Sequence, residues 1–175
     1  MIFHLSLGSN LGRRAANLAR AVRLLGEHGV DVVKASSIYE TEPVDNRDQP
    51  WFLNQVLEVR SGLDPPSLLR LAKSIEAAMK RVPTLPKGPR TIDIDILLAG
   101  DLVIDTPELV VPHPRLARRN FVLVPFREIA PEVRHPVLGK TIRDLALESA
   151  DLSRVTRRGR SERRRPGKNP ILRRV

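Results

Sequence analysis

The chain contains no cysteine and no long apolar run, and it has few aromatic residues. None of its 175 residues is cysteine, which excludes disulfide bonds, thiolate chemistry and cysteine-based zinc sites. No segment reaches the roughly 20 apolar residues that a membrane span needs. The first residues, MIFHLSLGSN, have neither the basic start nor the apolar run of a secretory signal. We therefore expect a soluble, cytoplasmic protein.

The residues that are present are those of a globular protein. Hydrophobic residues make up 41% of the chain and charged residues 29%, whereas Phe, Trp and Tyr together reach only 3%. A chain of 175 residues is one domain of ordinary size, long enough to bury a hydrophobic core.

The positive charge is concentrated at one end of the chain. The net charge is +10, but residues 154–175 hold ten Lys or Arg and one acid, so they account for +9 of it. Like-charge runs with few large apolar residues are usually disordered. We therefore expect one folded domain over 1–153 and a solvated basic tail over 154–175. The alternative, a tail that binds an acidic partner such as nucleic acid non-specifically, stays open.

Hydrophobic periodicity predicts strands at 2–7, 30–41, 52–61 and 92–98, helices at 12–27 and 65–81, and loops at 42–51 and 83–89. The order β-α-β-β-α-β is the ferredoxin-like arrangement, an α+β fold with a four-stranded antiparallel sheet and both helices on one face. The other face is then available for ligands. Beyond this core we expect a hairpin starting at 101–104 and short helices.

The stretch GPRTIDIDILL, residues 88–98, places two carboxylates on one face of a strand. Its isoleucines share one face, whereas Asp93 and Asp95 share the other, about 7 Å apart. Strands tolerate aspartate poorly, yet an antiparallel sheet often has one solvated face. The stretch alone leaves two interpretations open, a solvated face and a metal site.

Phosphate chemistry becomes attractive when the neighbouring charges are added. Magnesium prefers one or two carboxylates together with substrate phosphate oxygens. Phosphoryl transfer otherwise needs positioning and positive charge, which Arg81, Arg90 and Arg119 could provide as guanidinium groups. A ferredoxin-like module that holds RNA or DNA through its basic tail is the competing hypothesis, but it leaves the aspartate pair unexplained.

Several longer runs resemble one enzyme family. They are LSLGSNLG (5–12), SIYETEPV (37–44), DQPWFLN (48–54), GPRTIDIDILLAGDLVIDTPEL (88–109), VPHP (111–114), RRNF (118–121) and FREIAPE (126–132). Over about residues 2–145 the chain closely resembles the 6-hydroxymethyl-7,8-dihydropterin pyrophosphokinases of folate biosynthesis. The resemblance implies transfer of pyrophosphate from MgATP to the hydroxymethyl group of the pterin, with AMP released, by a single-domain monomer.

The resemblance also implies roles for individual residues. Asp93 and Asp95 correspond to the carboxylates that hold two Mg²⁺ ions, and with Arg81 and Arg90 they form the catalytic set. The implied ATP-binding residues are Glu76, Arg81, Lys87, Arg90, Ile96, His113 and Arg119. The implied pterin-binding residues are the stacking pair Phe52 and Phe121, the edge-reading Asn54, and Thr41, Glu42 and Val44.

The sequence departs from the family at two places near the expected nucleotide site. Pro86 and Lys87 stand where the family has other residues before Gly-Pro-Arg, and the loop 82–88 is about one residue short. Pro114 stands where the family commonly has tyrosine after the histidine. These departures concern contacts with adenine and the lid, and the basic tail has no counterpart that we can place.

Overall fold

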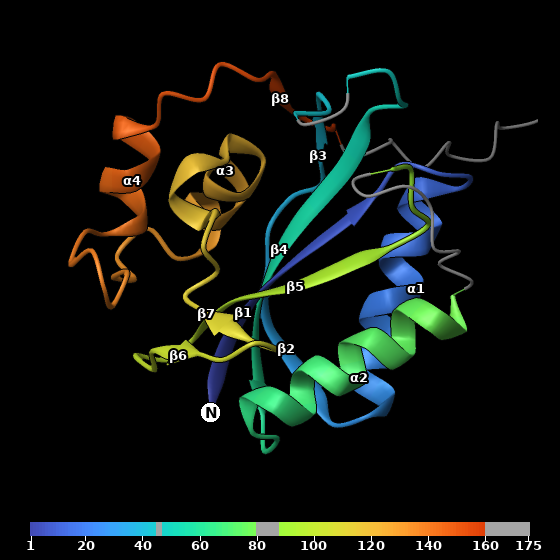
Figure 1. The fold of residues 1–175 in the computed structure, drawn as a ribbon. Helices are drawn as coiled ribbons and strands as arrows, with labels where there is room; N and C mark the ends of the chain where they lie inside the picture. The colour runs from blue at the N-terminus through green and yellow to red at the C-terminus, as the bar shows by residue number, and fades with distance from the viewer. Residues whose placement is uncertain (45–46, 80–87, 160–175) are drawn as a thin grey trace, which may run out of the picture.

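The fold is an antiparallel β-sheet between two pairs of helices, as seen in Figure 1. The computed structural model describes residues 1–44, 47–79 and 88–159. The elements of the expected core are β1 (Ile2–Ser9), α1 (Arg14–Glu27), β2 (Val30–Ala35), β3 (Tyr39–Thr41), β4 (Phe52–Ser61), α2 (Pro65–Ala78) and β5 (Asp93–Ala99). The later elements are β6 (Ile104–Asp105), β7 (Val110–Val111), the 3₁₀ helix η1 (Leu116–Arg118), α3 (Asn120–Ile129), α4 (Ile142–Glu148) and β8 (Val155–Arg157).

The central strands of the sheet are β1 and β4. The strands follow the order β5-β1-β4-β3-β8, and β2 also pairs with β4. In this register Gly8 of β1 lies opposite Asn54 of β4 on one side and opposite Asp93 of β5 on the other. Directly opposed residues point to the same face of a sheet. Three strands therefore bring these positions together.

The sheet is larger than the sequence predicts, with six strands among the described residues instead of four. One cause is that the predicted strand 30–41 is two strands, β2 and β3. Ser36 interrupts it, because its Oγ accepts a hydrogen bond from Val56 N (3.0 Å) and donates one to Ser37 O (2.7 Å). Both halves still pair with β4, so the chain bends without leaving the sheet.

The other cause is β8, which lies where the sequence analysis expects the basic tail to begin. Val155–Arg157 pairs antiparallel with β3, so ordered structure continues past residue 153. Residues 160–175, most of the predicted tail, lie outside the described part of the chain.

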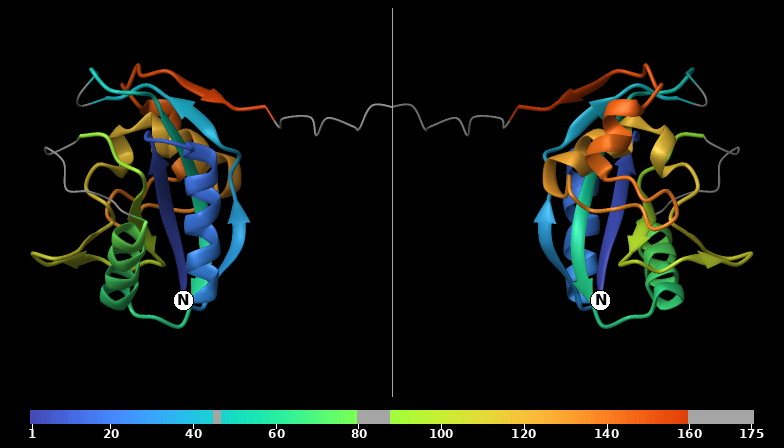
Figure 2. Two further views of the ribbon diagram at one scale, coloured as in Figure 1. Left: turned by 90° about the vertical axis from the view of Figure 1, so that its right-hand side faces the viewer. Right: turned by 90° about the vertical axis from the view of Figure 1, so that its left-hand side faces the viewer.

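The two faces of the sheet carry different layers. On one face, α1 and α2 pack on a core that includes Phe3, Leu5 and Leu7 of β1. On the other face, a second cluster joins Val56 of β4 and Leu97 of β5 to α3 and α4. Figure 2 shows these helix pairs from opposite sides. The second face, which the sequence analysis leaves open for ligands, is thus partly covered.

Three smaller findings complete the architecture. The predicted hairpin after the aspartate strand is the β6–β7 pair. The predicted helix 65–81 is observed as α2 up to Ala78, and the residues from 80 to 87 lie outside the described ones. Among the helices of the described ranges, none is both long and apolar enough to cross a membrane.

Candidate functional site

The open part of the second face holds a pocket of about 400 Å³. It receives side chains from both central strands, from α2 and from the loops at the same end of the sheet. The described residues that line it are Ser6, Gly8, Thr41, Glu42, Pro43, Val44, Gln49, Phe52, Asn54, Lys73, Arg90, Asp93, Asp95, His113, Pro114, Arg115, Arg119 and Phe121.

Eleven of the residues predicted from the sequence meet in this lining. They are Thr41, Glu42, Val44, Phe52, Asn54, Arg90, Asp93, Asp95, His113, Arg119 and Phe121. Glu76 and Ile96 are buried outside the lining. Arg81 and Lys87, together with most of the predicted 83–89 loop, lie outside the described residues.

The two aspartates of β5 form the acidic part of the pocket. The alternation expected for the strand is present, since Ile94 and Ile96 are buried in the core beneath α1 and α2 while Asp93 and Asp95 line the pocket. Arg90 Nη1 donates to Asp93 Oδ2 at 2.6 Å. Burial first, and then the neighbouring Asp93 charge, raise the pKa of Asp95 to about 6. The pair therefore favours a cation.

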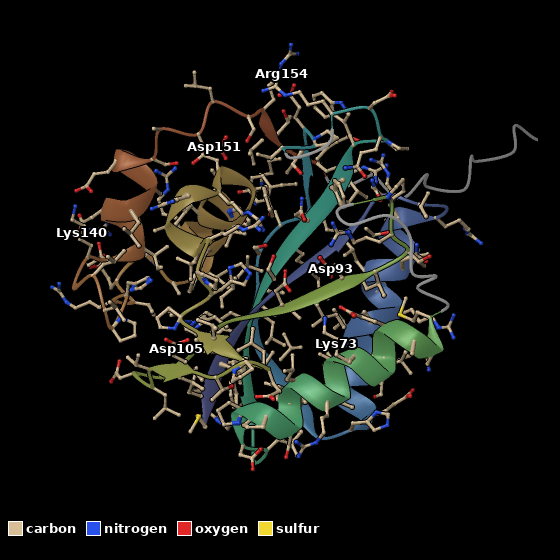
Figure 3. All side chains as sticks on the ribbon, in the orientation of Figure 1. Lys73, Asp93, Asp105, Lys140, Asp151 and Arg154 are labelled. Atoms are coloured by element: carbon tan, nitrogen blue, oxygen red, sulfur yellow. The ribbon has the colours of Figure 1, made fainter. Side chains whose placement is uncertain are left out.

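Glu76 supports this strand from α2. Its side chain is only 4% exposed, and its Oε1 accepts a hydrogen bond from Ile94 N at 2.8 Å, between the two aspartates. Lys73 Nζ lies 3.1 Å from Glu76 Oε2 and also lines the pocket. Figure 3 shows Lys73 on α2 and Asp93 on the neighbouring β5. The carboxylate of Glu76 thus fixes the backbone that presents the aspartates.

Basic and imidazole groups lie across from the aspartates, on the segment that follows β7. Burial first, and then the charges of Arg119 and Arg115, lower the pKa of His113 to about 4. Its Nδ1 accepts a hydrogen bond from Arg115 N at 3.1 Å, and its backbone N donates to Leu97 O at 2.9 Å. His113 is therefore held as a neutral ring among cations, in a place suited to an anion.

An aromatic niche adjoins the charged part of the pocket. Phe52 and Phe121 both line it, and each has a guanidinium over its ring: Arg90 lies 5.7 Å from the Phe52 centroid, and Arg119 lies 5.2 Å from that of Phe121. Between strands, Asn54 Nδ2 donates to Thr41 Oγ1 at 2.6 Å. Rings with a buried amide beside them suit a flat ligand with a polar edge.

Asn10 joins the two sides of the site. Its Nδ2 donates to Gln49 Oε1 (3.1 Å) and Pro50 O (3.0 Å) in the loop before β4, while its Oδ1 accepts from Arg90 N (2.7 Å). Arg14 holds the same loop by donating to Trp51 O at 2.7 Å. The turn after β1 thus fastens both the aromatic and the charged part of the pocket.

Sequence reasoning missed several residues of the lining. Ser6 and Gly8 share the strand face opposite Leu5 and Leu7, a signal that the alternation of β1 already carried. Lys73 lies three residues before Glu76, on the same side of a helix. Pro43, Gln49 and Arg115 lie on loops, where no periodicity reveals which way a side chain faces.

The metal-binding capacity of the pocket rests on two carboxylates. Within the described ranges, no group of three or more Asp, Glu, His or Cys residues could hold a metal ion. Magnesium often takes one or two protein carboxylates and completes its octahedron with water and phosphate oxygens. Asp93 and Asp95 fit such an ion when a phosphorylated ligand is present.

The fold and the site together define a class: a mixed α/β protein whose antiparallel sheet carries a small-molecule pocket with acidic, basic and aromatic parts. Comparison with known proteins narrows the class. The profile of the 7,8-dihydro-6-hydroxymethylpterin-pyrophosphokinase (HPPK) family matches residues 4–131.

Relatives of similar length agree with this match. The 2-amino-4-hydroxy-6-hydroxymethyldihydropteridine pyrophosphokinase of Bacillus subtilis is 47% identical over 133 residues, which is 75% of this chain and 80% of that one. The protein of the same name from Methylorubrum extorquens is 43% identical over 155 residues, covering 88% of this chain and 96% of that one. This chain belongs to the HPPK family and is a pyrophosphokinase.

Longer relatives contain a similar region. The folic acid synthesis protein fol1 of Pneumocystis carinii is 41% identical over 79% of this chain, but the match covers only 19% of fol1. Among solved structures, wild-type HPPK-DHPS of Plasmodium falciparum has a TM-score of 0.68 at 21% identity, covering 83% of this chain and 44% of that one. At this identity the structural likeness supports the fold alone.

Proposed function

We propose that the pocket is the active site for the reaction of the family: transfer of a pyrophosphoryl group from ATP to the hydroxymethyl oxygen of 6-hydroxymethyl-7,8-dihydropterin. The observation that carries this proposal is the strand register. It places the aspartates of β5 beside the aromatic niche of β4, with only β1 between them. A phosphate donor and a flat acceptor can therefore meet in one pocket.

The aromatic niche is the proposed pterin site. Phe52 and Phe121 offer apolar faces to the bicyclic ring, and the Asn54–Thr41 pair offers polar groups to its edge. Glu42 and Val44 line the same side. An aromatic ring between apolar faces with a few polar partners at its rim is the usual arrangement of such a site.

The basic groups are the proposed triphosphate site. Arg90 and Arg119 supply guanidinium groups, His113 supplies a neutral N–H donor, and Lys73 and Arg115 add charge that the sequence analysis does not assign. Arg81 and Lys87 are proposed for the same site from sequence alone. Ile96 would act there through its backbone groups, since its side chain lies in the core. We place Glu76 behind the site, as a support for β5.

Asp93 and Asp95 would hold magnesium, and we propose two ions. The donors fit, because burial and the Asp93 charge raise the cost of ionising Asp95, and a bound divalent cation would remove that cost. Bound there with ATP, the metal would neutralise charge on the phosphates and orient the groups that react. The chain itself contributes the rigid strand that keeps both carboxylates on one face.

The reaction balances with the two substrates alone. The hydroxymethyl oxygen of the pterin forms a bond to the β-phosphorus of ATP and loses its proton. The bond between the β-phosphorus and the oxygen that bridges it to the α-phosphorus breaks, and AMP leaves with that oxygen. The products are AMP, the pterin diphosphate and the proton, which is released to solvent. The arginines and His113 position the triphosphate, and the niche positions the hydroxymethyl group.

We make four proposals about the molecule as a whole. The six-stranded sheet is an elaborated ferredoxin-like core, in which β2 and β3 together take the place of one strand. The catalytic domain extends through β8, and the remaining basic tail is solvated. The protein works as a monomer. It works in the cytoplasm.

The direct test is to incubate the full chain with MgATP and the hydroxymethyl pterin and to identify the nucleotide product. AMP in equal amount to the pterin diphosphate supports the proposal, whereas ADP or no product contradicts it. Asp95→Ala should lower kcat by about a hundredfold or more if it removes a metal ligand. Asp105→Ala, at an exposed position of the β6–β7 hairpin, is the matched control and should leave kcat unchanged.

A further inference from the structure

The segment that follows α4 runs across the outside of the pocket without lining it. We call residues 151–158 the C-terminal strap. Figure 1 shows it passing above α3 to reach β3, and Figure 3 shows Asp151 and Arg154 along it. Its contacts are concentrated at two places, and each is next to a wall of the proposed pterin niche.

The first contact is with the start of α3. Asp151 Oδ2 accepts a hydrogen bond from Asn120 N at 2.7 Å, and Asn120 Nδ2 donates to Asp151 O. Burial opposes ionisation of this carboxyl, but hydrogen bonds from Asn120 and Ser153 still lower the pKa of Asp151. Asn120 is the residue before Phe121. The strap therefore fixes the backbone that presents one stacking ring.

The second contact is with β3. Within the strap, Val155–Arg157 forms β8, in which Val155 lies opposite Thr41. Glu42 N donates to Arg154 O at 3.0 Å, and Arg154 N donates to Glu42 Oε2 at 3.3 Å. Thr41 and Glu42 form the wall of the pocket that faces the ring edge. The same short segment therefore also fixes this wall.

An ion-pair network locks the strap to both elements at once. Arg157 Nε donates to Ser37 Oγ at 2.8 Å, and Arg157 Nη2 lies 3.3 Å from Glu128 Oε1 on α3. Glu128 also accepts hydrogen bonds from Ser37 N (2.9 Å) and Tyr39 OH (3.0 Å). The strap, α3 and the segment before β3 thus form one connected unit.

We infer that the C-terminal strap is a positioning element for the pterin: it sets the separation between the Phe121 wall and the Thr41–Glu42 wall. The inference rests on the proposed function of the niche and goes beyond it, because no strap residue lines the pocket. Ring stacking tolerates only a narrow range of distances, and a misplacement of about 1 Å can cost about a hundredfold in rate. Nucleotide binding, on the far side of the pocket, should depend on the strap much less.

Two truncations of the chain separate the strap from the tail. Ending the chain after Ser153 removes β8, and ending it after Gly159 keeps all of the strap. The shorter chain should show a KM for the pterin raised about tenfold or more, with the Kd for a non-hydrolysable MgATP analogue within about twofold of the full chain. The chain that ends after Gly159 should match the full chain in both values. Equal behaviour of the two truncations, or equal losses for both ligands, would overturn the inference.

Point variants keep the chain complete. Asp151→Ala removes the acceptor for Asn120 N and should raise the pterin KM in the same selective way. Asp151→Asn keeps a side-chain oxygen that can accept the hydrogen bond from Asn120 N, so it should restore most of the affinity. A merely structural role would lower melting temperature without this split between the two ligands, and that result would also overturn the inference.

Hydrogen exchange tests the strap without relying on catalysis. In Asp151→Ala, the amide of Glu42, which is bonded to Arg154 O at the other end of the strap, should exchange faster than in the full chain. Unchanged exchange at Glu42 would show that the strap does not couple the two walls. If the full chain makes no AMP, the proposed function fails, and this measurement still decides whether the coupling exists.

Discussion

A single glycine brings β1 close to the pterin niche. A Cβ atom added to Gly8 would lie 2.8 Å from Asn54 Oδ1 and 3.8 Å from a ring carbon of Phe52. The first distance is below a normal contact, so the amide of Asn54 would have to move. Since Asn54 is bonded to Thr41, the displacement would reach the groups proposed to read the ring edge.

Replacement of Gly8 by alanine should therefore raise the KM for the pterin by about tenfold or more, because a small displacement of a positioned group is expensive. The KM for ATP should change by less than about twofold. Steady-state kinetics with each substrate varied in turn checks both values. Gly62→Ala is the matched control, since an added Cβ there meets nothing within 4 Å. A Gly8→Ala enzyme with normal pterin KM would contradict the niche assignment.

The ionised carboxylate of Asp95 lowers the stability of the folded chain. Its folded-state pKa, about 6, lies above the usual value for an aspartate carboxyl, mainly because of burial and then because of the neighbouring Asp93 charge. A raised pKa means that the carboxyl makes its full contribution to the stability of the fold at pH values below its pKa in the unfolded chain. That contribution is lost as the pH rises through the folded value.

Asp95→Asn, measured without magnesium or nucleotide, should thus be more stable than the unchanged chain at about pH 7, by about 1–3 kcal/mol. The gain should shrink towards about pH 4, where Asp95 is protonated. Urea unfolding at several pH values measures it, and Asp105→Asn in the exposed hairpin serves as the control. A gain that does not depend on pH, or a loss at neutral pH, would show that burial and repulsion are not the cause.

At the scale of elements, the turn between β1 and α1 connects the aromatic part of the pocket to its charged part. Ser9 and Asn10 are types that often begin a helix, but α1 begins at Arg14 and no side chain caps it. Asn10 instead bonds the loop before β4 and the backbone of Arg90. The residue is buried, with 2% of its surface exposed.

Asn10→Ala should weaken both substrates together, unlike the variants that act on the niche alone. It leaves Arg90 N and Pro50 O without these partners, at a cost of about 1–3 kcal/mol in stability for each group that stays buried. We expect the KM for ATP and for the pterin both to rise about tenfold. Asn17→Ala, which removes hydrogen bonds of α1 to Ser9 and Leu11, is the control. A selective effect on one substrate would contradict the role of Asn10 in connecting the two parts of the pocket.

The elements also show what the sequence can reveal. Strands and helices with clear periodicity, such as β5 with its alternating Ile and Asp, are predicted because the pattern is local. The break at Ser36 is not, because it depends on a side chain that bonds Val56 across the sheet. β8 is hidden within a basic run, and it becomes a strand only by pairing with β3, more than a hundred residues earlier.

The same division applies to the candidate site. Motif residues such as Asp93, Asn54 and Phe121 are predictable because they lie within the sequence runs that resemble the family, and the structure brings them into one lining. Gly8 and Lys73 are missed because a glycine in a strand and a lysine on a helix have ordinary structural explanations. The register of β5, β1 and β4 shows what Gly8 faces, and the place of α2 beside the pocket shows what Lys73 faces.

At the scale of the whole molecule, charge and catalysis are separated along the chain. Residues 160–175 hold seven Arg or Lys and one Glu, so a chain that ends after Gly159 changes from a formal charge of +10 to +4. None of the pocket residues is removed. We therefore expect the excess charge to affect encounters with polyanions and not the site itself.

The chain shortened after Gly159 should elute from a heparin column at lower salt than the full chain, and its affinity for DNA should depend less steeply on salt. Turnover of MgATP and pterin should stay the same. Electrophoretic mobility shifts at several salt concentrations measure the slope. Unchanged DNA affinity would place the polyanion-binding surface on the folded part, and lost turnover in a folded chain would place the tail at the active site.

The strand β1 limits how this enzyme can diverge or acquire resistance. Phe3, Leu5 and Leu7 are packed beneath α1 and α2, while His4 contacts the ring of Phe126 and Gly8 lines the pocket. No position in the middle of this strand can drift without disturbing either the core or the ligand. Changes that exclude a competitive inhibitor yet spare the pterin should therefore arise in the loop before β4, where Gln49 lines the pocket and the chain can vary without losing the fold.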